Sequence, residues 1–137
     1  MPKTKHRIII DTNLWISFLL TKDFVKLDNL FRKKNLTLLF SQELLDEITE
    51  VAQRPKFEKY FSAISVENLF FKIRTVSEII TVSSKIDICR DEKDNFLLEL
   101  ANDGKATHLI TGDKDLLVLE KLNSTQILTM ADYFARK

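Results

Sequence analysis

The chain contains few of the residues that most often mark special structure: among its 137 residues are one cysteine, two glycines and two prolines. Because Cys89 has no second cysteine to pair with, it forms no internal disulfide, which fits a reducing compartment such as the cytoplasm. Little glycine and proline, together with 45% hydrophobic residues, argue against disorder. We therefore expect one compact, helix-rich domain spanning residues 1–137.

Long apolar runs and a strong charge of one sign are also missing. The hydrophobic stretches are much shorter than the roughly 20 residues that cross a bilayer, and the N-terminus lacks the apolar region of a signal peptide. The sequence therefore predicts no membrane association. The net charge of +1 gives no overall indication of nucleic-acid binding. Basic residues nevertheless form three local groups, which are Lys3, Lys5 and Arg7; Arg32, Lys33 and Lys34; and Arg54, Lys56 and Lys59. Such groups are most often ordinary solvated surface.

Short apolar segments alternate along the chain with segments of helical periodicity. Buried strands are expected at residues 7–11, 37–40, 79–82, 107–111 and 126–128. Helices are expected at residues 14–20, 24–34, 43–52, 57–61, 65–79, 94–104, 116–119 and 130–136, with Ser41 as an N-cap and Gly104 as a C-terminal stop signal. This alternation predicts an α/β fold with three layers, in which helices flank a central parallel sheet of about five strands.

Three of the apolar runs lead into aspartates. Asp11 follows the first run, Asp91 and Asp94 follow the run at Ile88 and Cys89, and Asp113 and Asp115 follow the fourth predicted strand. Acids at strand ends and helix starts gather at the carboxyl edge of a parallel sheet, where open α/β folds bind ligands. Converging carboxylates repel each other unless a cation lies among them. The pattern therefore predicts a divalent-metal site that acts on phosphates.

A further acid comes from the helix expected at residues 43–52. At about 100° per residue, Glu47 lies at the border of the apolar arc, whereas Glu43, Asp46 and Glu50 fall outside it. A carboxylate at this border can lean into a cleft. Glutamates on helix surfaces are common, however, so an ordinary solvated position for Glu47 stays open at this point.

Each aspartate also has a structural explanation. Asp11 can cap the helix that follows it, and Asp91 with Asp94 three residues later imitates a capping box. Asp115 fits a cap of the helix at residues 116–119 slightly better than a ligand. We therefore assign Asp91 and Asp115 as caps. The remaining candidate ligands are Asp11, Glu47, Asp94 and Asp113.

The order of the motifs resembles that of the PIN-domain ribonucleases. The motifs are Asp11-Thr12-Asn13 after the first strand, S-x-x-L-x-x-E from Ser41, D-x-x-D-x-F-L-x-x-x-A from Asp91, and L-I-T-G-D-K-D-L from Leu109. They are short individually but specific in this order, and the match runs from about Ile8 to Leu128. It is closest to the VapC-like branch, described as toxins of toxin–antitoxin systems.

The resemblance implies a PIN-like fold and an endoribonuclease that depends on Mg²⁺ or Mn²⁺. Carried over position by position, the catalytic and metal-binding quartet falls on Asp11, Glu47, Asp94 and Asp113, and supporting polar positions fall on Asn13, Ser41 and Thr111. The resemblance also implies an RNA substrate and an antitoxin protein as a partner. The family commonly has D-P-x-D where this chain has Asp91-Glu92-Lys93-Asp94. The missing proline loosens this loop but keeps the acid.

Two other functions fit parts of this sequence. An aspartyl-phosphate enzyme of the haloacid-dehalogenase type needs a second acid beside the first-strand aspartate, and Asp11-Thr12-Asn13 has none. A PIN-like module that binds RNA or protein without cutting remains an alternative, although the intact quartet argues against it. His6 and His108 lie before and within predicted strands, and we expect both to be structural.

The chain is rich in phenylalanine, with ten residues. The pairs Phe57 with Phe61 and Phe70 with Phe71 exceed what one helix face would bury. Exposed aromatic residues commonly mark protein interfaces. We therefore expect a homodimer or antitoxin surface at these pairs.

Overall fold

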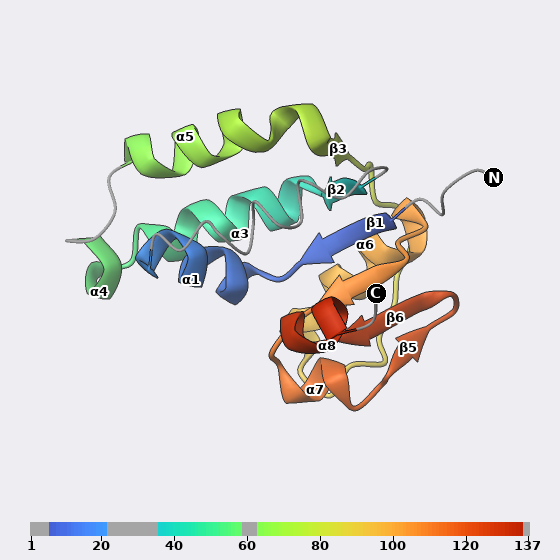
Figure 1. Ribbon diagram of the computed structural model, residues 1–137. Coiled ribbons are helices and arrows are strands. Elements are labelled where there is room, and N and C mark those ends of the chain that lie inside the picture. The colour runs from blue at the N-terminus through green and yellow to red at the C-terminus, as the bar shows by residue number, and fades with distance from the viewer. Residues whose placement is uncertain (1–5, 22–35, 59–62, 136–137) are drawn as a thin grey trace.

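The computed structural model describes residues 6–21, 36–58 and 63–135 (Figure 1). The helix expected at residues 24–34 lies outside these residues, as does most of the helix expected at residues 57–61. Within the described ranges, every helix is too short or too polar to cross a bilayer.

The core of the fold is a sheet of six strands in the order β3-β2-β1-β4-β6-β5. The strand bounds are β1 His6–Ile10, β2 Leu36–Phe40, β3 Ser77–Ile79, β4 His108–Ile110, β5 Lys121–Leu122 and β6 Thr125–Leu128. All neighbours pair in parallel except β5 and β6, which are antiparallel. The three isoleucines of β1 are completely or almost completely buried, as expected for a central strand covered on both faces.

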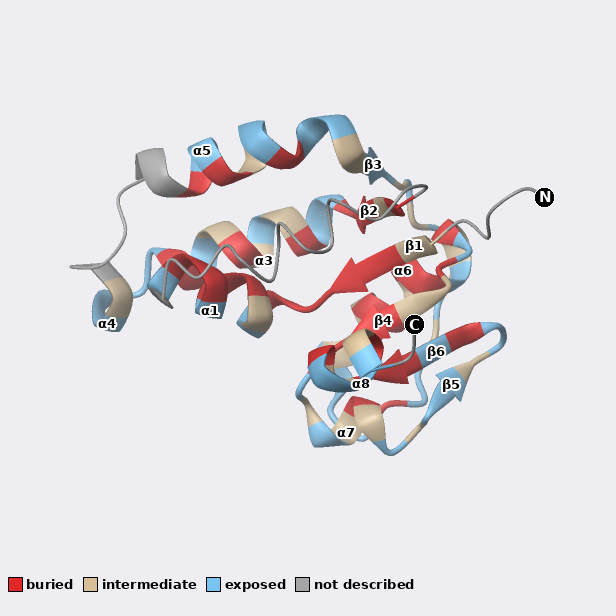
Figure 2. Cartoon of the chain, in the orientation of Figure 1, coloured by how far each residue is buried: buried red, intermediate tan, exposed pale blue. Residues whose placement is uncertain are grey.

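The helices connect these strands. Their bounds are α1 Thr12–Thr21, α3 Gln42–Ala52, α4 Pro55–Glu58, α5 Ala63–Ile73, α6 Asn95–Gly104, α7 Lys114–Leu117 and α8 Met130–Ala135, with 3₁₀ turns η1 Arg74–Val76 and η2 Glu92–Asp94. Figure 2 shows the buried surface concentrated along β1 and β4, while α5 turns an exposed side outward. The expected α/β fold with flanking helices is confirmed.

Two adjacent residues of β2 show how the layers are arranged. The Phe40 ring contacts Trp15 of α1 and Phe70 of α5. Its neighbour Leu39 faces α6, since a Cβ added at Gly104 would lie 2.9 Å from Leu39 Cδ1. Successive side chains of a strand point to opposite faces of the sheet. Therefore α1 and α5 cover one face and α6 covers the other.

The expected sheet of about five strands is present with one addition, the short antiparallel strand β5, which makes six. Two details of the expected elements are wrong. The helix expected at residues 65–79 ends at Ile73, and β3 occupies residues 77–79 instead of 79–82, because Ser77 to Ile79 pair with β2. Gly104 is the last residue of α6, and Lys105, with φ of 52°, takes the left-handed position after it.

Candidate active site

The candidate site lies where the order of strands reverses. From β1 the sheet extends to β2 and β3 on one side and to β4, β6 and β5 on the other. Asp11 directly follows β1, and its backbone N–H donates to the Ile110 carbonyl of β4 at 3.1 Å. The carboxyl ends of β1 and β4 are therefore held side by side. Such a reversal is the usual ligand position in open α/β sheets.

A cavity of about 120 Å³ opens at these strand ends. We call it the acid cavity, and its lining residues are Asp11, Thr12, Asn13, Glu47, Val51, Arg54, Asp94, Leu97 and Asp113. The structure thus brings together all four acids of the expected quartet, from four different segments of the chain. Of the supporting positions, Asn13 lines the cavity, Thr111 lies directly behind it, and Ser41 does neither.

Asp11 is held from two sides. The Thr111 hydroxyl donates to Asp11 Oδ2, and the Leu14 backbone N–H donates to Asp11 Oδ1 at 3.0 Å. The side chain therefore caps the start of α1 and also lines the cavity, so the structural and functional explanations hold together. Asp11 is only 5% exposed, and this burial raises its pKa. The two hydrogen bonds oppose that effect, and the charge of Asp113 adds to it.

Glu47 reaches the cavity from α3. Its side chain accepts a hydrogen bond from the Thr12 hydroxyl. It is half-buried, whereas Glu43, Asp46 and Glu50 are exposed, which confirms the position expected from the helical pattern. Ser41, one of the expected supporting residues, caps α3 by accepting the Leu44 N–H at 3.1 Å. It supports Glu47 only by fixing the start of the helix.

Asp94 stands at the junction between η2 and α6. Asp91 caps η2, because its carboxylate accepts the Lys93 N–H at 3.1 Å and its carbonyl accepts the Asp94 N–H at 3.0 Å. Asp94 Oδ2 is buried, and no hydrogen-bond partner for it exists among the described residues. Burial, followed by the neighbouring Asp113 carboxyl, raises the pKa of Asp94 to about 7. Among the residues that the structure describes, no cationic side chain forms an ion pair with this carboxylate, although a buried charge requires a partner.

Asp113 both lines the acid cavity and caps α7, although the sequence pattern assigns the cap to Asp115. Its carboxylate caps α7 by accepting the Asp115 backbone N–H at 2.9 Å. The expectation that Asp115 caps this helix is therefore wrong, since Asp115 lies inside the first turn and Asp113 precedes it. The Asp113 N–H in turn donates to the Thr111 hydroxyl at 3.0 Å.

Arg54 is a charged lining residue that the sequence alone does not assign to the site. It belongs to the basic group of Arg54, Lys56 and Lys59, which no sequence motif connects with the acids. Arg54 lies two residues beyond the end of α3 and follows Glu47 by seven residues, a spacing that would bring both to one side if the helical period continued past Ala52. That spacing was the available signal.

The two histidines lie away from the acid cavity. The rings of His6 and His108 stack with centroids 5.0 Å apart, and the Tyr133 hydroxyl lies 2.9 Å from His6 Nδ1. Neither histidine lines the cavity. Their place in a packed cluster between β1, β4 and α8 agrees with the expected structural role.

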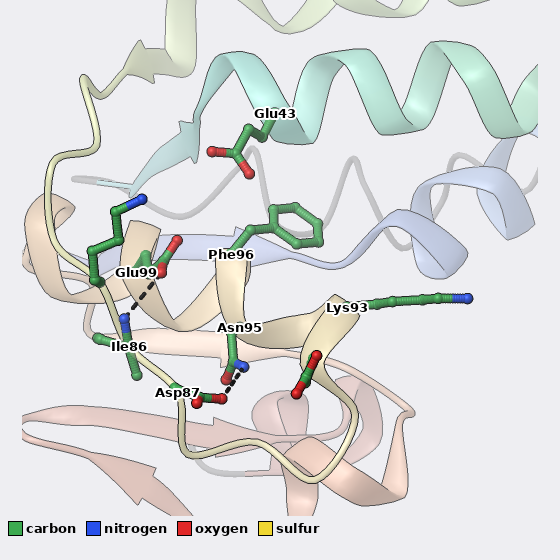
Figure 3. Close-up of a pocket in the computed structure, with 9 residues that line it drawn as sticks. Glu43, Ile86, Asp87, Lys93, Asn95, Phe96 and Glu99 are labelled. Carbon is green, nitrogen blue, oxygen red and sulfur yellow. Dashed lines mark hydrogen bonds between the residues drawn. The ribbon is translucent and has the colours of Figure 1, made fainter.

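A larger cavity of about 500 Å³ lies on the other side of the first turn of α6 and contains none of the quartet (Figure 3). Its polar groups bind the loop before α6. Glu99 accepts the Ile86 N–H at 3.0 Å, and the Asn95 amide donates to Asp87 at 3.3 Å. Asn95 Oδ1 also accepts the Cys89 N–H at 2.9 Å. These contacts anchor the loop that leads to Asp94.

The side chains of the acid cavity suit a hard divalent cation. Among the described residues, no three Asp, Glu, His or Cys side chains are already gathered closely enough to hold a metal ion. The donor set nevertheless fits, since it consists of four carboxylates, and Mg²⁺ and Mn²⁺ prefer oxygen ligands. The unpartnered Asp94 oxygen and the raised pKa values of Asp11 and Asp94 both indicate negative charge that lacks compensation.

The fold and the cavity define an α/β protein with a carboxylate cluster at the carboxyl edge of its sheet. The PIN domain model matches residues 7–115, and the chain belongs to the PIN domain family, a family of nucleases. It is 38% identical over 130 residues to the uncharacterized protein MJ1680 of Methanocaldococcus jannaschii, covering 90% of this chain and 81% of that protein. Among solved structures, it is similar in fold to VapC20 of Mycobacterium tuberculosis, a toxin that cleaves the sarcin-ricin loop. The TM-score is 0.58 with 14% identity, over 84% of this chain and 96% of that one.

Proposed function

We propose that the protein is an endoribonuclease that hydrolyses RNA phosphodiester bonds at the acid cavity with Mg²⁺ or Mn²⁺. One observation supports this proposal: in a PIN domain, four carboxylates line one cavity, and one of them has a buried oxygen with no hydrogen-bond partner in the described part of the chain. Membership of a nuclease family supports the reaction class. The residue roles and the metal are our assignments.

Asp11, Asp94 and Asp113 would hold the cation, directly or through water. When bound, it would acidify a water molecule and stabilise negative charge on the phosphate. Glu47 would orient the attacking water by accepting a hydrogen bond from it, or hold a second ion. Thr111 and the Leu14 N–H fix both oxygens of Asp11, and Thr12 fixes Glu47. These contacts therefore set the positions of Asp11 and Glu47 before the substrate arrives.

The similarity in fold to a VapC toxin supports a role as the toxin of a toxin–antitoxin pair, with RNA as substrate and an antitoxin as partner. Phe71 is 65% exposed, and Phe70 beside it is half-buried. We retain this surface as the proposed homodimer or antitoxin contact; Phe61 lies outside the described residues. A single domain over residues 1–137 and a cytoplasmic location remain part of the proposal.

Purified protein incubated with RNA tests the activity. Cleavage is expected with Mg²⁺ or Mn²⁺, none in EDTA, and none for Asp11→Asn. Asp46→Asn is the matched control, because Asp46 is exposed on α3 and does not line the acid cavity. Full activity of Asp11→Asn would overturn the assignment. RNA binding without cleavage by wild type would instead favour the non-catalytic module.

A further inference from the structure

The acid cavity has one cationic side chain among the described residues that line it, and this is Arg54. The other charged groups there are the four carboxylates. RNA carries one negative charge per phosphate, so these carboxylates repel the substrate that the cavity is proposed to cut. A cation would offset part of this repulsion at the reacting phosphate. A positive side chain beside the acids would offset the repulsion of the phosphates next to the reacting one.

The backbone of Arg54 is held firmly between two helices. Its N–H donates to the Val51 carbonyl at 3.1 Å, and its own carbonyl accepts the Phe57 N–H at 2.8 Å. Pro55 follows, opens α4 and restricts the conformation of the residue before it. The Cα atom from which the guanidinium extends therefore has a defined position relative to Glu47 and the rest of α3.

The side chain of Arg54 is held much more loosely. It is 52% exposed, and one terminal nitrogen lies 3.6 Å from Glu50 Oε1, four residues earlier on α3. Glu50 is itself 71% exposed. An exposed pair of this kind, at a long distance and through one nitrogen, contributes little to stability. Its guanidinium can therefore leave Glu50 for a stronger acceptor at small cost.

We propose that Arg54 binds RNA backbone phosphate at the rim of the acid cavity, exchanging Glu50 for phosphate oxygens. This inference rests on the proposed function. A guanidinium presents parallel N–H groups that can donate to two phosphate oxygens at once. The carboxylates of the cavity offer no such donors, and a lysine ammonium matches this geometry less well. Arg54 is thus a substrate-binding residue that positions the RNA, separate from the four acids that would hold the metal.

The test measures RNA binding and cleavage for four variants of the full chain. Arg54→Ala is expected to lower kcat/KM for RNA by about 10-fold or more. It should also reduce the slope of log affinity against log salt by about one, as for loss of one phosphate contact. Arg54→Lys should recover part of the affinity and the full salt slope. Glu50→Gln should leave cleavage unchanged or improve it.

Lys56→Ala is the matched control. Lys56 lies two residues away on the same exposed segment, with Nζ 4.9 Å from the centre of the Phe57 ring, but it does not line the cavity. We expect a much smaller effect from this variant. Titration with Mn²⁺ and a thermal melt of each variant separate substrate binding from damage to the cavity. Arg54→Ala should bind Mn²⁺ as well as wild type and melt at a similar temperature.

The outcomes distinguish this inference from the proposed function. If wild type cuts RNA and Arg54→Ala cuts and binds it equally well with the same salt slope, the Arg54 proposal is wrong and the nuclease assignment stands. A much weaker Mn²⁺ affinity in Arg54→Ala would also overturn it, since Arg54 would then organise the acids. If wild type binds RNA without cutting it, the nuclease assignment fails, and the salt slopes still decide the role of Arg54. If it neither binds nor cuts RNA, both fail.

Discussion

The Thr111 hydroxyl joins the two strand ends that carry the acid cavity. It donates to Asp11 Oδ2 after β1 and accepts the backbone N–H of Asp113 at 3.0 Å after β4. Thr111 is fully buried, so water does not compete for these bonds. One hydroxyl thus sets the relative position of two proposed ligands that lie far apart in the sequence.

Replacing this hydroxyl should weaken both stability and metal binding. Thr111→Val keeps the volume but leaves Asp11 Oδ2 and the Asp113 N–H without their partner, a loss of about 1–3 kcal/mol in the free energy of unfolding. Loss of an orienting contact of this kind lowers metal affinity or activity about 10–100-fold. Urea denaturation and Mn²⁺ titration measure the two effects.

Thr125→Val is the control for this prediction, because the Thr125 hydroxyl is also buried and donates to the Ala106 carbonyl at 2.7 Å, away from the cavity. It should lose stability while keeping the metal affinity of wild type. Equal metal affinities for Thr111→Val and wild type would show that the hydroxyl has only a structural role.

Two glutamates one turn apart on α3 separate a role in the cavity from a general effect of charge. Glu47→Gln removes the carboxylate that lines the acid cavity, and we expect cleavage to fall by more than about 100-fold, beyond the effect of losing an orienting neighbour. Glu43→Gln makes the same change at an exposed position and should cleave like wild type. Initial rates with Mg²⁺ measure both, and similar rates for the two variants would contradict the assignment of Glu47.

The stability of the metal-free protein should fall as the pH rises from about 4 to about 7. The pKa of Asp94 is raised from 3.8 to about 7 in the folded protein by burial and by Asp113, so the folded state holds this proton more tightly than the unfolded state. Its favourable contribution is complete below the unfolded pKa and is lost as the pH passes the folded pKa. Burial raises the pKa of Asp11 in the same direction.

Melting curves in EDTA across this pH range measure the effect. Asp94→Asn removes the charge and should flatten the pH profile, and it should make the protein more stable than wild type at pH values above 7, where wild-type Asp94 is ionised. Saturating Mn²⁺ should restore stability at high pH in wild type only. A wild-type profile that rises steadily from pH 4 to 7 would contradict the raised pKa.

The two glycines of the chain should differ in their tolerance of a methyl group. A Cβ at Gly104 would lie 2.9 Å from Leu39 Cδ1 and 3.2 Å from Ile80 Cγ1, whereas a Cβ at Gly112 would meet nothing within 4 Å. Gly104→Ala should therefore destabilise the fold. The cost of overpacking, about 1–3 kcal/mol, exceeds the free energy gained from the higher helix propensity of alanine. Gly112→Ala should be nearly neutral in the same denaturation experiment. Equal midpoints would contradict the close packing of α6 on β2.

The sequence was sufficient to predict features determined by local patterns. Three buried isoleucines followed by Asp11 identify a central strand and its carboxyl end, and Ser41 before an amphipathic segment identifies the start of α3. The helical angle of Glu47 was likewise enough to separate it from its neighbouring acids. These predictions depend on the period of one element and on its first residues.

Features decided by contacts between distant segments were not predictable in this way. Val76 and Ile79 continue the helical spacing of α5, but pairing of Ile79 with Phe40 places residues 77–79 in a strand. The pair Asp113 and Asp115 offers two possible caps for α7, and the structure shows that Asp113 takes this position. Strand β5 has two residues, too few for a periodic pattern, and it forms through a hairpin in which Asn123 has a φ of 53°.

Cleavage of RNA by Asp113→Asn tests the central claim most directly. Asparagine keeps the oxygen that accepts the Asp115 N–H and caps helices as well as aspartate, so the variant retains the fold and loses only the charge. We predict that wild type cuts RNA with Mg²⁺ or Mn²⁺ and stops in EDTA. Asp113→Asn should melt in Mg²⁺-free buffer at a temperature equal to or above that of wild type, since it no longer repels Asp94, and should cut at least about 100-fold more slowly. Equal cleavage by the two proteins, or wild-type cleavage that persists in EDTA, would contradict a metal site built from these carboxylates.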